Sequence, residues 1–241
     1  KQALLGLGGD FALSPSISAI HQLKQQQRVP GTDDSSKFFL PSIDVATSSS
    51  TTSEIPSSSV TQANILRVFT NEHGFSESIA ADDCGGVFGL LLDRTSFYAE
   101  GGGQVSDAGS IRISSSEGLS ASMTASVIDV QSFGQYILHS CVLQSADSDM
   151  GGDGRAHAAR AAEMFREGAV VELRVDEDKR NRIVPNHTMT HVLNFVLREV
   201  LQSHAIDQKG SLVAAEKMRF DFSYHKALSV PIVAKIEARV N

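Results

Sequence analysis

Hydrophobic residues at helical spacing predict three helices in this chain. Isoleucine and leucine recur every third position within residues 16–27. Within residues 187–201, valines and leucines form two adjacent stripes, and Asn186 stands before them as the expected N-cap. Ser229 has the same position before a last helix, whose first turn tolerates Pro231. The pattern therefore predicts one helix near the start of the chain and two helices after residue 186.

Between these helices the pattern is that of short β-strands. Glycine-rich turns divide residues 65–137 into short runs, including an apolar run at 87–92 and a β-branched run at 126–130. Residues 170–175 alternate between polar and apolar side chains, and residues 219–222 alternate again. Short strands separated by glycine turns are typical of a barrel or a sandwich, so we expect one of these here.

Two polar stretches interrupt the pattern and help to divide the chain. Residues 47–59 are mostly serine and threonine, a composition that cannot bury a core and predicts an inserted surface loop. Residues 151–154 contain three glycines and predict a flexible loop. We predict a helical and linker segment at 1–62, a β-barrel-like module at 63–175, and the first part of another domain at 176–241.

Composition limits the classes of function. The formal net charge of −7 does not mark the chain as a polyanion binder, so any nucleic-acid contact would be local. Cys84 and Cys141 cannot build a disulfide framework and suggest a reducing compartment. No apolar run approaches the roughly 20 residues of a membrane span. Because the chain starts without Met and ends within a helical pattern at Asn241, we expect it to be a piece of a longer protein.

His187 and His191 are the candidate metal ligands. Residues four apart lie on one face of a helix, and two neutral imidazoles so placed can share a metal ion. The glutamate of the zinc-protease motif is missing, because Thr188 follows His187, so a zinc protease is disfavoured. The pair could equally belong to a polar helix surface, since this spacing defines a metal site only together with further ligands.

Two other stretches have both a functional and a structural interpretation. The glycines at 101–103 permit positive φ and close backbone approach, and Gln104 could hold the polar end of a small ligand. A hairpin turn is the simpler interpretation, and neither a dinucleotide fingerprint nor a P-loop fits the spacing. Lys209, Lys217 and Arg219 could touch a phosphate backbone, but their small number favours a solvated strand edge.

Four segments taken together resemble the editing region of alanyl-tRNA synthetase. In that family's order, they are TSFYAEGGGQ at 95–104, NHTMTH at 186–191, QKGSLV at 208–213 and RFDF at 219–222. Residues 31–38 resemble the stretch before this region in eukaryotic-type enzymes. The resemblance implies an α+β fold, with a glycine-rich β-barrel-like module followed by an α/β editing domain of the threonyl- and alanyl-tRNA synthetase type. The editing domain would be incomplete at its C-terminus.

The resemblance also implies an activity and its residues. The reaction would be hydrolysis of Ser-tRNA(Ala) or Gly-tRNA(Ala), with tRNA(Ala) as partner. Zn²⁺ would sit on His187 and His191 and on a later Cys-x-x-x-His, while Thr95 and Gln104 would line the pocket and sense the serine hydroxyl. No such Cys-x-x-x-His occurs before Asn241, so we expect weak or no zinc binding and little hydrolysis by this chain alone. ATP and Mg²⁺ would serve only the alanine-activating catalytic core, which this sequence lacks.

The sequence departs from the family at two positions, and we consider two other functions for it. The family usually has alanine in place of Met189, which could narrow the site or pack beside it, and often another residue in place of Gly101. A standalone deacylase is disfavoured by residues 32–34, because such proteins generally begin near the barrel. A non-catalytic module that binds tRNA or supports a larger assembly is the alternative. We expect a cytoplasmic location, with an organelle left open, no membrane association, and any homo-oligomer formed through parts outside this sequence.

Overall fold

The chain forms two compact units. The computed structural model describes residues 13–25, 29–38, 60–80, 83, 85–114, 122–144, 154–202 and 206–241. The first unit, here called the barrel unit, comprises residues 1–99 and 107–175. The second, the C-terminal unit, comprises residues 100–106 and 176–241, so the chain enters it at two separate points. The predicted serine- and threonine-rich loop at 47–59 lies outside the described residues, as does the predicted loop at 151–154 except for Gly154.

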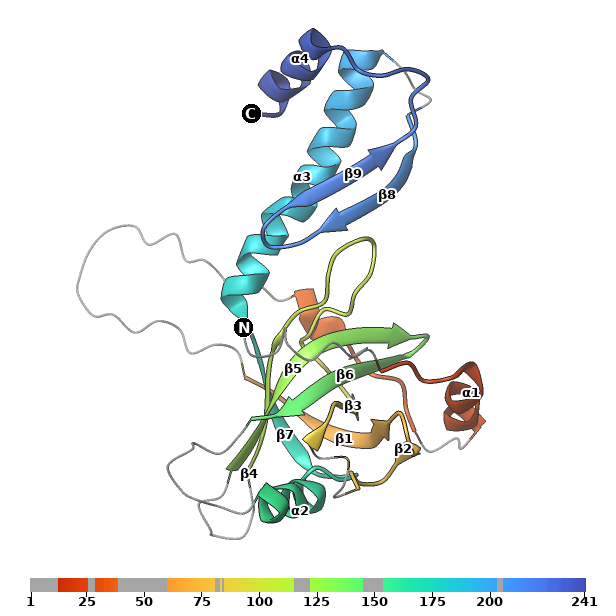
Figure 1. The fold of residues 1–241 in the computed structure, drawn as a ribbon, viewed down its shortest axis with the longest axis vertical. Helices are drawn as coiled ribbons and strands as arrows, with labels where there is room; N and C mark the ends of the chain where they lie inside the picture. Colours follow the sequence, from red (N-terminus) through yellow and green to blue (C-terminus); the bar gives the residue numbers. More distant parts are fainter. Residues whose placement is uncertain are drawn as a thin grey trace, which may run out of the picture. The chain divides into compact units, whose positions relative to one another are not determined.

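A closed β-barrel forms the centre of the barrel unit. Its strands are β1 (Thr61–Thr70), β3 (Phe88–Leu92), β4 (Gly109–Ser114), β5 (Ser122–Phe133), β6 (Tyr136–Leu143) and β7 (Val170–Val175). They pair in the order β1-β3-β6-β5-β4-β7, and β1 also pairs with β7, which closes the ring (Figure 1). Each of these pairings is antiparallel. The short strand β2 (Gly74–Ser76) adds to β1 through a tight turn.

The strand pattern of the sequence explains the barrel core. All five residues of β3 are buried, whereas buried and half-exposed positions mostly alternate along β5, as expected for a strand with one inward face. The helix α2 (Gly154–Met164), which the sequence pattern did not predict, brings Ala161 into this core, and Phe165 follows it there. The helix α1 (Ile17–Gln25) buries Leu23 in a separate cluster with Tyr136. The predicted strand runs at 87–92 and 126–130 are confirmed within β3 and β5.

The C-terminal unit is a long helix with a β-hairpin and a second helix packed on it (Figure 1). Its elements are α3 (Glu177–Leu201), β8 (Gln208–Val213), β9 (Met218–Phe222) and α4 (Val230–Val240). The valine and leucine stripes of α3 pack against Ile206 and Ile236 in a common core, which confirms the predicted stripes. Ser229 is the N-cap of α4, as predicted, with a proline in the first turn. No helix in the described parts of the chain is long and apolar enough to cross a membrane.

The predicted N-cap at Asn186 is wrong. Helix α3 begins at Glu177, and its N-cap is Asp176, whose side chain accepts a hydrogen bond from the Lys179 backbone N–H at 2.9 Å. Two acidic residues in the first turn further stabilise the positive end of the helix dipole. The charged first turns carry no apolar stripe, and Pro185 lies within the helix, so the sequence pattern suggested a later start.

Candidate functional site

The three glycines and Gln104 form a tight turn in the C-terminal unit. The Gly101 N–H donates to the Gln104 carbonyl at 3.1 Å, and the Gln104 N–H donates to the Gly101 carbonyl at 2.9 Å. The central residues, Gly102 and Gly103, have φ of 60° and 85°, as in type I′ turns. The hairpin-turn interpretation of this stretch is therefore confirmed.

This turn packs edge-on against β8. The Val213 N–H donates to the Gly103 carbonyl at 2.7 Å, and the Ser211 hydroxyl donates to the Gly102 carbonyl at 3.1 Å. A Cβ atom on Gly103 would lie 2.6 Å from the Ser211 carbonyl oxygen, so only glycine fits there. Gly101 is not among the glycines with positive φ, so its backbone conformation does not require glycine.

The turn places the Gln104 carboxamide against His187. Gln104 is buried, and its Oε1 lies 2.5 Å from His187 Nδ1. Because an amide oxygen can only accept, Nδ1 must carry the imidazole proton. The Nε2 atom of neutral His187 then keeps its lone pair, which is the arrangement found where a histidine binds a metal through one nitrogen and is oriented through the other.

Helix α3 brings His187 and His191 together as predicted. The imidazole centroids are 5.8 Å apart and the ring planes differ by 21°. His187 is half-buried and His191 is exposed. The Asn186 side-chain amide donates to the Ala214 carbonyl at 2.7 Å, and this bond holds the helix next to the end of β8. The two rings therefore lie at a fixed place beside the glycine turn.

Met189 lies on a different side of α3 from the two histidines. It is two residues from each of them, and residues two apart on a helix do not face each other. Of the two interpretations of this departure from the family, the geometry favours packing away from the imidazoles over narrowing of the site.

The pair fits part of a zinc ligand set. Imidazole nitrogens are preferred zinc ligands, and His187 has the tautomer that leaves Nε2 available. Among the described residues, no third histidine, cysteine or carboxylate joins these two within ligand distance. Cys141 is buried in the barrel unit, where burial raises the pKa of its thiol, and Cys84 lies outside the described residues.

Thr95 lies in the barrel unit, not in the unit that contains Gln104. Its side chain is 0% exposed, and its hydroxyl lies 2.7 Å from His139 Nε2. His139 Nδ1 lies 3.1 Å from the Leu90 carbonyl oxygen, so Nδ1 is the protonated nitrogen and Nε2 accepts from Thr95. Burial lowers the pKa of His139 to about 4. Sequence reasoning missed His139, although a histidine within the apolar run of β6 is a signal that could have been noticed.

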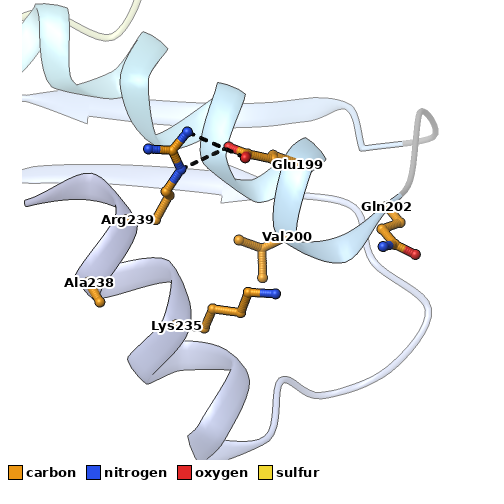
Figure 2. A pocket seen from close by; sticks show the side chains of 6 residues that line it. All are labelled: Glu199, Val200, Gln202, Lys235, Ala238 and Arg239. Carbon is orange, nitrogen blue, oxygen red and sulfur yellow. Dashed lines mark hydrogen bonds and ion pairs between the residues drawn. The ribbon is translucent and has the colours of Figure 1, made fainter.

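A surface hollow of the C-terminal unit lies between α3 and α4 (Figure 2). It is lined by Glu199, Val200, Gln202, Lys235, Ala238 and Arg239. Arg239 Nε donates to the Glu199 carboxylate at 3.2 Å across it. None of the predicted site residues lines this hollow, which is at the C-terminal end of α3, so we do not assign the candidate site to it.

The basic cluster is largely neutralised by its neighbours. Lys209 pairs with Asp207 at 3.5 Å, and Arg219 pairs with Asp221 at 3.1 Å. All four side chains are well exposed, so these pairs add little stability. The arrangement agrees with the solvated strand edge that the charge count favours.

Comparisons with known proteins identify the family. A family model described as "tRNA synthetases class II (A)" matches residues 17–159. The chain is 32% identical to the alanine–tRNA ligase of Schizosaccharomyces pombe over 98% of its own length and 20% of the relative's. It is 31% identical to the cytoplasmic alanine–tRNA ligase of Bombyx mori over 97% of its length and 21% of the relative's. It is 38% identical to the alanine–tRNA ligase of Rhizorhabdus wittichii over 68% of its own length and 16% of the relative's.

The barrel, the glycine turn with its histidine pair and these matches lead to one classification. The chain belongs to the class II tRNA synthetases. Within that class it belongs with the alanine–tRNA ligases, also called alanyl-tRNA synthetases. The chain spans about a fifth of the length of the curated relatives that match almost all of it.

Proposed function

We propose that this chain is the part of an alanine–tRNA ligase that hydrolyses Ser-tRNA(Ala) or Gly-tRNA(Ala). The observation that carries the proposal is the hydrogen bond between Gln104 Oε1 and His187 Nδ1, which joins two of the four family-like segments in one place. It is supported by His191, which lies beside His187 on the same helix.

The chemistry of amino-acid selection explains why such a site is needed. A pocket that fits alanine cannot strongly reject glycine, which is smaller, and it rejects an added hydroxyl poorly. A hydrophobic pocket discriminates by only about 10–200-fold per methylene, which falls short of the accuracy that translation needs. A second site that hydrolyses the wrong ester supplies the missing discrimination.

The residues of the site can divide the work as follows. His187 and His191 would present imidazole nitrogens to Zn²⁺, and a bound zinc ion would supply Lewis-acid polarisation of the ester or of a water molecule. Gln104 holds the His187 tautomer through its oxygen, and its amide nitrogen makes no hydrogen bond within the described parts of the chain. That NH₂ group can therefore donate to the hydroxyl or carbonyl oxygen of the aminoacyl ester.

The activities of the whole protein follow from its relatives. We infer that the complete protein attaches alanine to tRNA(Ala), using ATP and Mg²⁺ in a catalytic core that this sequence does not contain. The names of the relatives support this activity, and the name of the Bombyx mori relative supports a cytoplasmic location.

Single substitutions at the two histidines test the editing function. In the full-length protein, His187→Ala and His191→Ala should each lower the rate of Ser-tRNA(Ala) hydrolysis by about 100-fold or more, because each would remove a metal ligand. His225→Ala is a matched control, since His225 is an exposed histidine of the same unit. Wild-type hydrolysis rates in both variants would contradict the ligand assignment, whereas a wild-type protein that hydrolyses neither ester would favour a non-catalytic module.

A further inference from the structure

We propose that Thr95 and His139 are positioning residues, which fix the barrel end of the segment that carries Gln104, and that Thr95 does not contact the aminoacyl ester. This inference rests on the proposed function and deepens it. It replaces the expectation that Thr95 senses the serine hydroxyl with a role inside the barrel unit.

The hydrogen-bonding capacity of the Thr95 hydroxyl is already used. A threonine hydroxyl has one proton to donate and lone pairs with which to accept. The proton is donated to His139 Nε2 at 2.7 Å, and the oxygen accepts from the Phe97 backbone N–H at 3.1 Å. With Thr95 0% exposed, no donor remains for a substrate hydroxyl.

His139 ties this threonine to two strands of the barrel. It lies on β6 opposite Leu90 of β3, and its Nδ1–H donates to the Leu90 carbonyl. The imidazole also packs edge-on against Phe97, with ring centroids 5.5 Å apart. Both nitrogens of a fully buried neutral imidazole are thus satisfied, and loss of the Thr95 donor would leave Nε2 buried without a partner.

The backbone on both sides of the glycine turn is held in the same unit. The Thr95 N–H donates to the Asp33 carbonyl at 2.8 Å. The Tyr98 N–H donates to Asp107 Oδ2 at 2.7 Å, and the Asp107 N–H donates to the Tyr98 carbonyl at 3.0 Å. The ends of the family-like segment are therefore barrel anchors, and only residues 100–106 belong to the unit with the histidines.

Two esters that differ by a hydroxyl separate positioning from sensing. Thr95→Val, which keeps the shape and removes the hydroxyl, is compared with Thr95→Ser in the full-length protein, using Ser-tRNA(Ala) and Gly-tRNA(Ala). Glycine has no hydroxyl to sense. We expect Thr95→Val to slow both hydrolyses by the same factor, with their ratio within about twofold of the wild-type ratio, and Thr95→Ser to retain both. A loss of about tenfold for the serine ester alone, or no loss for either, would overturn the proposal.

A control and a second variant keep the outcome clear. Thr70→Val removes another buried threonine hydroxyl of the barrel, one that accepts from the His73 N–H, and should leave both rates near wild type. His139→Phe keeps a ring without nitrogens and should reproduce the equal loss if Thr95→Val does not fold.

Amide hydrogen exchange gives a readout that does not need hydrolysis. The Phe97 N–H should exchange faster in Thr95→Val than in Thr95→Ser, and equal rates would overturn the anchoring role. If the wild-type protein hydrolyses neither ester, the proposed function fails, while the exchange rates still decide the role of Thr95.

Discussion

At the scale of single residues, the position of the imidazole proton determines which nitrogen of His187 can act as a ligand or acceptor. Gln104 Oε1 accepts a hydrogen bond from the Nδ1–H group of His187. Nε2 is therefore the only nitrogen of this ring with a free lone pair. The amide also fixes the ring orientation, since Gln104 is itself buried and held by the glycine turn. The neighbouring His191 has no such partner among the described residues and is exposed. The two imidazoles are therefore unequal: His187 is oriented by a hydrogen bond, whereas His191 is exposed and its only ring contact among the described residues is with His187.

Removal of the Gln104 carboxamide should release the His187 tautomer. Gln104→Leu keeps the approximate volume but leaves no acceptor, so we expect a mixture of Nδ1–H and Nε2–H forms in place of the single form. Imidazole ¹⁵N chemical shifts measure this directly. Under the proposed editing function, hydrolysis of Ser-tRNA(Ala) by the full-length variant should fall about 10–100-fold, the loss typical when a hydrogen-bond partner of a metal-binding histidine is removed. Gln62→Leu, at an exposed position of β1 outside the four family-like segments, is the control and should change neither. An unchanged tautomer in Gln104→Leu would contradict this role.

The buried His139 should make the barrel less stable in mild acid. Its pKa falls from 6.5 to about 4 on folding, because burial disfavours the charged imidazole. Below pH 6.5 the unfolded chain takes up a proton that the folded barrel does not, until about pH 4. Above pH 6.5 the buried neutral imidazole therefore does not reduce the free energy of unfolding. As the pH falls from 6.5 to about 4, the free energy of unfolding decreases by about 3 kcal/mol in all.

Urea unfolding at a series of pH values tests this dependence. Between about pH 6 and pH 5, the free energy of unfolding of the wild-type chain should fall more steeply than that of His139→Phe, by about 1 kcal/mol per pH unit. Equal slopes in the two proteins would show that His139 titrates alike in the folded and unfolded chains.

At the scale of elements, the glycine turn acts as a short extra strand on the edge of β8. Its backbone exchanges hydrogen bonds with Val213, and a bridge pairs Gln104 with the same residue. This pairing needs the close approach at Gly103 and positive φ at two successive residues. The position of the Gln104 carboxamide therefore depends on the backbone of a turn rather than on side-chain packing.

Alanine substitutions at the two central glycines should have unequal effects. Gly102→Ala meets no atom within 4 Å, so its cost is the positive φ alone, about 1 kcal/mol. Gly103→Ala adds a Cβ atom that overlaps the Ser211 backbone, which should cost more than Gly102→Ala and separate the turn from β8. Thermal unfolding measures the loss of stability in both variants. The imidazole ¹⁵N shifts of His187 report whether the turn has separated from β8 in Gly103→Ala. Equal losses of stability in the two variants would contradict the close approach.

The elements also show how far the sequence could predict the structure. The sequence pattern predicted the apolar stripes of α3 and α4 and the alternation of β7, because each of these elements has one buried face. Helix α2 was missed since it is largely alanine with polar residues, which gives a weak apolar pattern. At the site, the i,i+4 spacing predicted the histidine pair. The contact of His187 with Gln104 joins residues far apart in sequence and was not predicted, although the family resemblance implied that both residues belong to one site. His139 was missed because its partner, Thr95, comes from a different segment.

At the scale of the whole molecule, two imidazoles should not suffice for a tight zinc site. In calorimetric titration of the 241-residue chain with Zn²⁺, we expect weak or no binding, because structural and catalytic zinc sites have at least three protein ligands. Glu72, His73 and Asp83 of the barrel unit lie within ligand distance of one another, so His73→Ala separates any zinc bound there from zinc at the candidate site. A tight one-to-one site that survives His73→Ala but is lost in His187→Ala would contradict the expectation.

Because two separate segments of the chain form the C-terminal unit, the two units cannot be exchanged independently by gene recombination. No single break in the gene separates the two units, because residues 100–106 are encoded in the middle of the barrel. A gene segment for residues 176–241 would carry both histidines without Gln104, whereas a segment for the barrel would carry Gln104 without its histidine. Recombination could therefore transfer Gln104 together with both histidines only as one block that includes the barrel. The barrel would accompany the site through evolution even if it took no part in the chemistry.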